Sequence, residues 1–149
     1  MESLPEQPER QGHQLLAAIS NAMVAAMKQY YGRGPMRAKS YMVDDYLFVA
    51  MRDPLTVVEQ TLLRAGRHDL VREYRQVFQN EMAAEFTGQI EQLTGRRVLS
   101  YQSQIMFDPD TVIEIFVLES RGDGSEEAQA TAEDQMAVGE ATPDAISAE

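Results

Sequence analysis

The chain is 149 residues long, the length of one ordinary domain, and its 24 acidic and 13 basic residues give a net charge of −11. It contains no cysteine, which excludes disulfides, thiolate metal ligands and a cysteine nucleophile. The negative charge disfavours nucleic acid and anionic lipid as general partners, because both attract basic proteins.

Composition divides the chain near residue 120. Residues 121–149 hold eight acidic residues, one basic residue and no aromatic residue, for a net charge of −7, whereas residues 1–120 hold sixteen acidic and twelve basic residues, for −4. The last segment buries too little apolar surface to offset an ordering entropy of roughly 1–2 kcal/mol per residue. We predict a flexible arm over residues 1–9, a single domain over 10–120 and a disordered acidic tail after it. The tail would serve solubility; the alternative is an arm for a basic partner.

The start of the chain is acidic and polar, the opposite of the basic and apolar opening of a signal peptide. No apolar run approaches the roughly 20 residues that a membrane span requires. We therefore expect a cytoplasmic protein with no membrane span, which reaches a membrane only through a partner.

The first predicted element is a helix over residues 10–31. Apolar residues recur along it at spacings of three and four, as in Leu16, Ile19 and Met23, and give one broad apolar stripe. Gly32 is typical of the left-handed residue that ends a helix.

Two β-rich runs follow, residues 36–43 and 46–52, and the acidic pair Asp44-Asp45 between them predicts a hairpin. The second run is apolar on both faces. That pattern indicates an inner strand, or a strand whose outer face meets another subunit. Together with the broad stripe of the first helix, it leads us to expect a homodimer.

Two helices come next. Thr56 and Glu59 form a capping-box pattern at the start of the first, and the second covers residues 68–94. The second helix carries an apolar residue at every third or fourth position: Val71, Tyr74, Phe78, Met82, Phe86, Ile90 and Leu93. Arg72 and Arg75 alternate with this stripe, and we predict that both lie on the solvated face.

Two further β-rich runs, residues 96–107 and 111–119, flank the turn-forming segment Asp108-Pro109-Asp110. The order is therefore α-ββ-αα-ββ. Helices do not alternate with single strands, which argues against a doubly wound parallel sheet. We predict an α+β domain with a four-stranded, mostly antiparallel sheet and helices packed mainly on one face.

The segment Gly32-Arg33-Gly34-Pro35 is the closest approach to a phosphate-binding loop. Such loops follow a strand and open a helix, whose N-terminus attracts the phosphate. These glycines follow a helix and open a strand, so we interpret them as a corner in the chain.

No other pattern predicts catalysis. His13 and His68 lie 55 positions apart, and neither has neighbours at metal-ligand spacing. The sequence contains no recognisable set of nucleophile, base and oxyanion donors. We predict no catalytic, cofactor-binding or metal-binding residue and expect that the protein is not an enzyme.

Basic residues nevertheless gather around the predicted corner. Arg37 and Lys39 lie two positions apart on a predicted strand and hence on the same face. Together with Arg33, Gln102 and Gln104 they are our candidates for binding a partner or an anion. The alternative is a solvated strand edge, because positive charges there discourage unwanted pairing.

This basic face also supports an alternative function. A ligand- or nucleic-acid-binding module could use Arg37 and Lys39 for charge and Tyr41 or Tyr46 for stacking. We prefer an interaction module, because the net charge of the chain disfavours nucleic acid.

The order of four short signs resembles a family of small bacterial proteins, formerly a domain of unknown function and now named after MpsC of the Na+-translocating membrane-potential-generating system. The resemblance covers about residues 12–119. The signs are Gly34-Pro35 before the first strand, Asp44-Asp45 ending it, Leu55-Thr56 with Glu59 at the next helix, and Leu93-Thr94-Gly95 before the third strand.

The resemblance implies an accessory α+β protein, some of whose relatives are encoded beside membrane machinery for cation or inorganic-carbon uptake. It carries over no catalytic residue, and the acidic tail departs from the usual short form. We therefore expect a non-enzymatic accessory or regulatory module that binds a protein partner, such as a membrane transport complex.

Overall fold

The computed structural model describes the backbone of residues 8–121 and the side chains of residues 12–121. Its elements are α1 (Pro8–Tyr31), β1 (Arg37–Val43), β2 (Tyr46–Arg52), α2 (Val57–Arg64), α3 (His68–Thr94), β3 (Val98–Met106) and β4 (Thr111–Leu118). Apart from residues 8, 9 and 121, the predicted arm and acidic tail lie outside the described residues.

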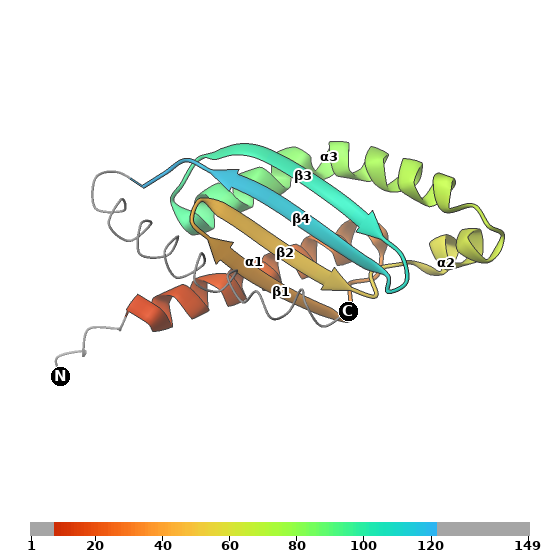
Figure 1. Cartoon of the computed structure of the whole chain (residues 1–149), viewed down its shortest axis with the longest axis horizontal. Coiled ribbons are helices and arrows are strands. Elements are labelled where there is room, and N and C mark those ends of the chain that lie inside the picture. Colours follow the sequence, from red (N-terminus) through yellow and green to blue (C-terminus); the bar gives the residue numbers. More distant parts are fainter. Residues whose placement is uncertain (1–7, 122–149) are drawn as a thin grey trace, which may run out of the picture.

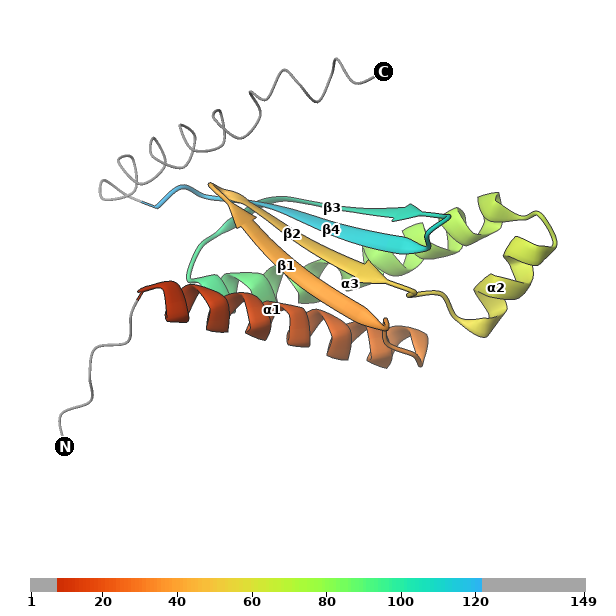
Figure 2. The ribbon, with the colours of Figure 1, turned by 60° about the horizontal axis from the view of Figure 1, so that its bottom comes forward.

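The four strands form one antiparallel sheet in the order β1-β2-β4-β3 (Figure 1). The strands β2 and β4 lie at the centre, and β1 and β3 form the two edges. Helices α1 and α3 pack against the same face of the sheet (Figure 2), and α2 lies beyond one of its ends. The predicted α+β class, element order and placement of the helices are confirmed.

Local chemistry explains where several elements begin and end. Thr56 Oγ1 accepts a hydrogen bond from the Glu59 N–H, and the Glu59 carboxylate accepts one from the Thr56 N–H, so the predicted capping box begins α2. Gly95 ends α3 with a φ of 67°. The hairpins turn without glycine, and Asp44 and Asp108 adopt φ values of 52° and 54° there. Aspartate tolerates this region better than most residues.

The core lies between the sheet and the two long helices. Its largest fully buried apolar residues come from α1, β2, α3, β4 and the segment before α2: Ile19, Met23, Leu47, Met51, Leu55, Met82, Phe86, Ile90, Phe116 and Leu118. The alternation in β2 and β4 places one side of each strand in this core. The apolar stripe of α1 packs against that same side.

The buried side of α3 differs from the predicted stripe. Tyr74 and Leu93 are more than a third exposed, whereas Arg75 and Gln79 are buried. The ring of Tyr74 lies 6.5 Å from that of Tyr31 in α1 and so borders the contact between the helices. A repeat of apolar residues shows that a helix has a buried side, but neighbouring elements decide how far that side extends.

Candidate functional site

One face of the sheet is covered by no described helix (Figure 2). Along β2, Leu47, Val49 and Met51 are fully buried against the helices, whereas Tyr46 and Phe48 point to the other side. We call this second surface the open face. Its rows across β1, β2, β4 and β3 are Arg37, Arg52, Thr111 and Met106; Lys39, Ala50, Ile113 and Gln104; Tyr41, Phe48, Ile115 and Gln102; and Val43, Tyr46, Val117 and Ser100.

The centre of the open face is apolar. The two central strands contribute five partly exposed apolar residues, namely Phe48, Ala50, Ile113, Ile115 and Val117. Tyr41 and Tyr46 border them and are 44% and 48% exposed. A contiguous exposed apolar patch is typical of a surface on which another molecule docks.

One corner of the open face is basic. Arg37 and Arg52 are direct cross-strand partners, and Lys39 lies two residues further along β1. Like charges in such positions weaken strand pairing, so this corner favours a negatively charged partner. The Lys39 ammonium lies 5.2 Å from the centre of the Tyr41 ring, and none of the ion pairs of residues 12–121 includes these three basic side chains.

The other two candidate residues that share this face, Gln102 and Gln104, lie on β3 at the opposite edge. Three strand spacings separate them from Arg37 and Lys39, which is about 14 Å at the usual distance between strands. The four side chains therefore border the apolar centre and do not converge on one small ligand. Alternation along the strand predicted that Arg37 and Lys39 share a face, but only the strand order gives their separation from Gln102 and Gln104.

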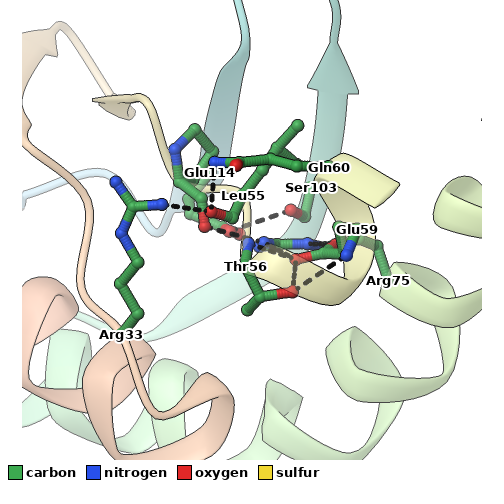
Figure 3. A network of polar contacts seen from close by, with 9 residues as sticks. Arg33, Leu55, Thr56, Glu59, Gln60, Arg75, Ser103 and Glu114 are labelled. Carbon is green, nitrogen blue, oxygen red and sulfur yellow. Dashed lines mark hydrogen bonds and ion pairs between the residues drawn. The ribbon is translucent and has the colours of Figure 1, made fainter. Parts of the chain in front are cut away.

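Arg33, the fifth candidate, is not on the open face. Its guanidinium donates a hydrogen bond of 2.5 Å to the carbonyl of Leu55 and ties the corner after α1 to the segment before α2 (Figure 3). Gly32 has a φ of 77° directly after α1, which agrees with the interpretation of this segment as a corner.

The covered side of the sheet holds an ion pair that the sequence did not reveal. Arg75 donates two hydrogen bonds, of 2.5 and 2.6 Å, to the carboxylate of Glu59 and one of 2.9 Å to the carbonyl of Pro54 (Figure 3). Its guanidinium carbon lies 3.9 Å from the centre of the Tyr31 ring. Arg75 and Glu59 are 2% and 0% exposed, so the prediction that Arg75 faces solvent was wrong.

A second buried acid lies on β4. Glu114 is fully buried and accepts hydrogen bonds from the hydroxyls of Tyr101, at short distance, and Ser103, at 2.8 Å. Burial raises the pKa of Glu114 to about 7, although the two hydroxyls and the charge of Arg75 oppose this shift. Burial, followed by the charge of Glu114, likewise raises the pKa of Tyr101.

Each of the two buried acids is satisfied by its own partners within the fold. The oxygens of Glu59 and Glu114 are occupied by neighbouring donors. Within residues 12–121 no group of three or more histidine, aspartate or glutamate side chains could hold a metal ion. The sequence did indicate that Glu114 is a buried acid, because Glu114 occupies one position of the apolar alternation formed by Val112, Phe116 and Leu118.

A family model described as "Na+-translocating membrane potential-generating system (MpsC)" matches residues 11–120 of the chain. No curated protein and no solved structure matches the chain. In the described part of the chain, no helix is both long enough and apolar enough to cross a membrane.

Proposed function

This chain belongs to the MpsC family, and on that premise we propose that it is a non-enzymatic accessory module that binds a protein of a membrane-potential-generating system through the open face of its sheet. The observation that carries the proposal is the apolar centre of that face. The family name supports the context, because it refers to a system that works at a membrane.

The composition of the open face favours a protein over a small ligand. Its centre is apolar over two adjacent strands and its polar groups lie at the border, which is the usual arrangement of a protein interface. The exposed aromatic rings of Tyr41 and Tyr46 are the residue type that contributes most to such interfaces. The basic corner adds a preference for an acidic region of the partner.

Substitutions on the open face test this proposal. Tyr46→Thr combined with Ile115→Thr removes two apolar side chains while keeping strand-forming residues. The control is Val58→Thr combined with Val77→Thr, because these helical valines are 62% and 61% exposed.

The assay compares the amount of integral membrane protein that the tagged full chain retains from detergent-solubilised native membranes. We expect the open-face variant to retain at most about a tenth of the wild-type amount and the control variant to retain all of it. Equal retention by both variants, or no retained membrane protein with the wild type, would contradict the proposal.

The homodimer predicted from the sequence stays a prediction, and it would use this same surface. Light scattering of the full chain at micromolar concentration checks it. A mass of one chain would exclude the dimer, whereas a doubled mass that the substitutions at Tyr46 and Ile115 abolish would assign the open face to a second copy.

The alternative of a ligand- or nucleic-acid-binding module also stays a prediction. The cation–π contact between Lys39 and Tyr41 is the observation that favours it. It requires an affinity for RNA or a nucleotide that falls with salt and is lost in Arg37→Ala/Lys39→Ala.

A further inference from the structure

We propose that the outer edge of β1 and the adjoining side of α1 bind an extended, acidic segment of the partner protein as a fifth strand of the sheet. This inference rests on the proposed function, because it describes how the partner of the open face is held. The shape of this edge, its regularity and its charge support it.

A groove of about 590 Å³ runs between α1 and β1. Leu16, Ala17 and Asn21 of α1 form one side, residues 38–43 of β1 form the other, and the lining is mainly apolar. Because β1 is an edge strand, the groove lies on its outer side. An added strand would form main-chain hydrogen bonds with β1 and rest alternate side chains on α1, as peptides do in grooves between an edge strand and a helix.

The two edges of the sheet differ in how well they could accept such a strand. The register of β3 is irregular between Val98 and Ser100, and its exposed residues include Leu99 and Met106 as well as Gln102 and Gln104. Such a bulge is a common device that protects a sheet edge, whereas the basic charges of β1 protect its edge against any strand that is not acidic. In contrast, β1 pairs with β2 in unbroken register over all seven residues, so its outer edge is regular and as long as a typical strand.

The charge of β1 indicates which kind of segment binds at its edge. Its two charged side chains, Arg37 and Lys39, are both basic and exposed, and no ion pair of residues 12–121 includes them. Pairing of two β1 edges would bring four such charges together, which disfavours a second copy at this edge. The same charges attract a strand that carries aspartate or glutamate on the side of the open face. The occupant is therefore apolar at the positions facing α1 and acidic at the positions between them.

The first test uses the full chain and a blocked heptapeptide in which valine alternates with glutamate; a valine–lysine heptapeptide is its charge control. We expect the glutamate peptide to shift the amide NMR signals of β1 and to slow hydrogen exchange along that strand. The lysine peptide should bind at least about tenfold more weakly, because it repels Arg37 and Lys39.

Variants then locate the site. Ala17→Tyr fills the groove from α1, and we expect it to weaken binding of the glutamate peptide by about tenfold or more. Ala25→Tyr is the matched control, because Ala25 is also exposed on α1 but does not line the groove. Lys39→Glu should invert the preference between the two peptides. Thermal unfolding of each variant verifies that the fold is retained.

Three results would overturn the inference. One is that the glutamate peptide does not bind, and another is that its binding is unchanged in both Ala17→Tyr and Lys39→Glu. The third is that the β1 amides that do not pair with β2 already exchange slowly in the free chain, because another copy or other residues of the chain would then cover the edge. The substitutions at Tyr46 and Ile115 lie outside the groove, so loss of the open-face interaction and loss of peptide binding are separate outcomes.

Discussion

The two faces of the sheet differ in the side chains they carry and in what those side chains contact. The covered face encloses two acidic side chains that are held by partners within the fold, Glu59 by Arg75 and Glu114 by Tyr101 and Ser103. The open face presents apolar side chains and basic residues that no described helix covers. Polar groups that are satisfied inside a protein serve its architecture. Apolar groups gathered at the surface are typical of docking sites, so the difference between the faces supports the proposal that the open face binds a partner.

The largest effect on stability is expected from removing the ion pair of Arg75 on the covered face. Arg75→Ala leaves Glu59 fully buried without its ionic partner and should lower the free energy of unfolding by about 3–5 kcal/mol. Urea denaturation measures this loss. The double variant Arg75→Met/Glu59→Gln removes both charges and should regain most of it; a double variant as unstable as Arg75→Ala would contradict this account.

A matched truncation on each face sharpens the comparison. Phe116 is fully buried on β4, and Phe116→Ala should cost about 3–5 kcal/mol of unfolding free energy. Tyr46 is 48% exposed, and Tyr46→Ala should cost about 1 kcal/mol. Equal losses in urea denaturation would show that the open face is covered in the protein at rest.

Glu114 makes the stability of the covered face depend on pH. Its folded pKa of about 7 lies above the ordinary value of 4.5, so between these values the folded chain keeps a proton that the unfolded chain releases. The free energy of unfolding should therefore fall, by about 3 kcal/mol in total, as the pH rises through this window.

The variant Glu114→Gln isolates this effect, because glutamine does not titrate. We expect its urea unfolding at pH 4.5, 6 and 8 to lack the decline and to show higher stability than the wild type at pH 8. Glu73→Gln, at an exposed position of α3, is the control and should keep the decline. A decline of the same size in Glu114→Gln would assign it to another group.

The smallest effect on stability is expected on the open face at Lys39. Lys39→Gln removes an exposed charge that no ion pair of the described residues uses, and it should change the free energy of unfolding by less than about 0.5 kcal/mol. The same variant should reduce the salt dependence of binding to the valine–glutamate peptide. Titrations at two salt concentrations measure this, and a salt dependence equal to that of the wild type would remove Lys39 from the site.

The sequence by itself determined the elements and their order. Thr56 and Glu59 are three residues apart and Gly95 acts on the last turn of α3, so these signals need no other part of the fold. The alternation along the strands also determined that Arg37 and Lys39 share a face, because successive side chains of a strand point to opposite sides.

Only the tertiary structure decided how these pieces combine. The strand order β1-β2-β4-β3 sets Arg37 and Lys39 apart from Gln102 and Gln104, and the position of α1 and α3 decides which face stays open. Arg75 is buried because Glu59, sixteen residues earlier, meets it after the chain turns between α2 and α3. Local patterns act over a few residues, whereas burial and charge pairing depend on segments that become neighbours only when the chain folds.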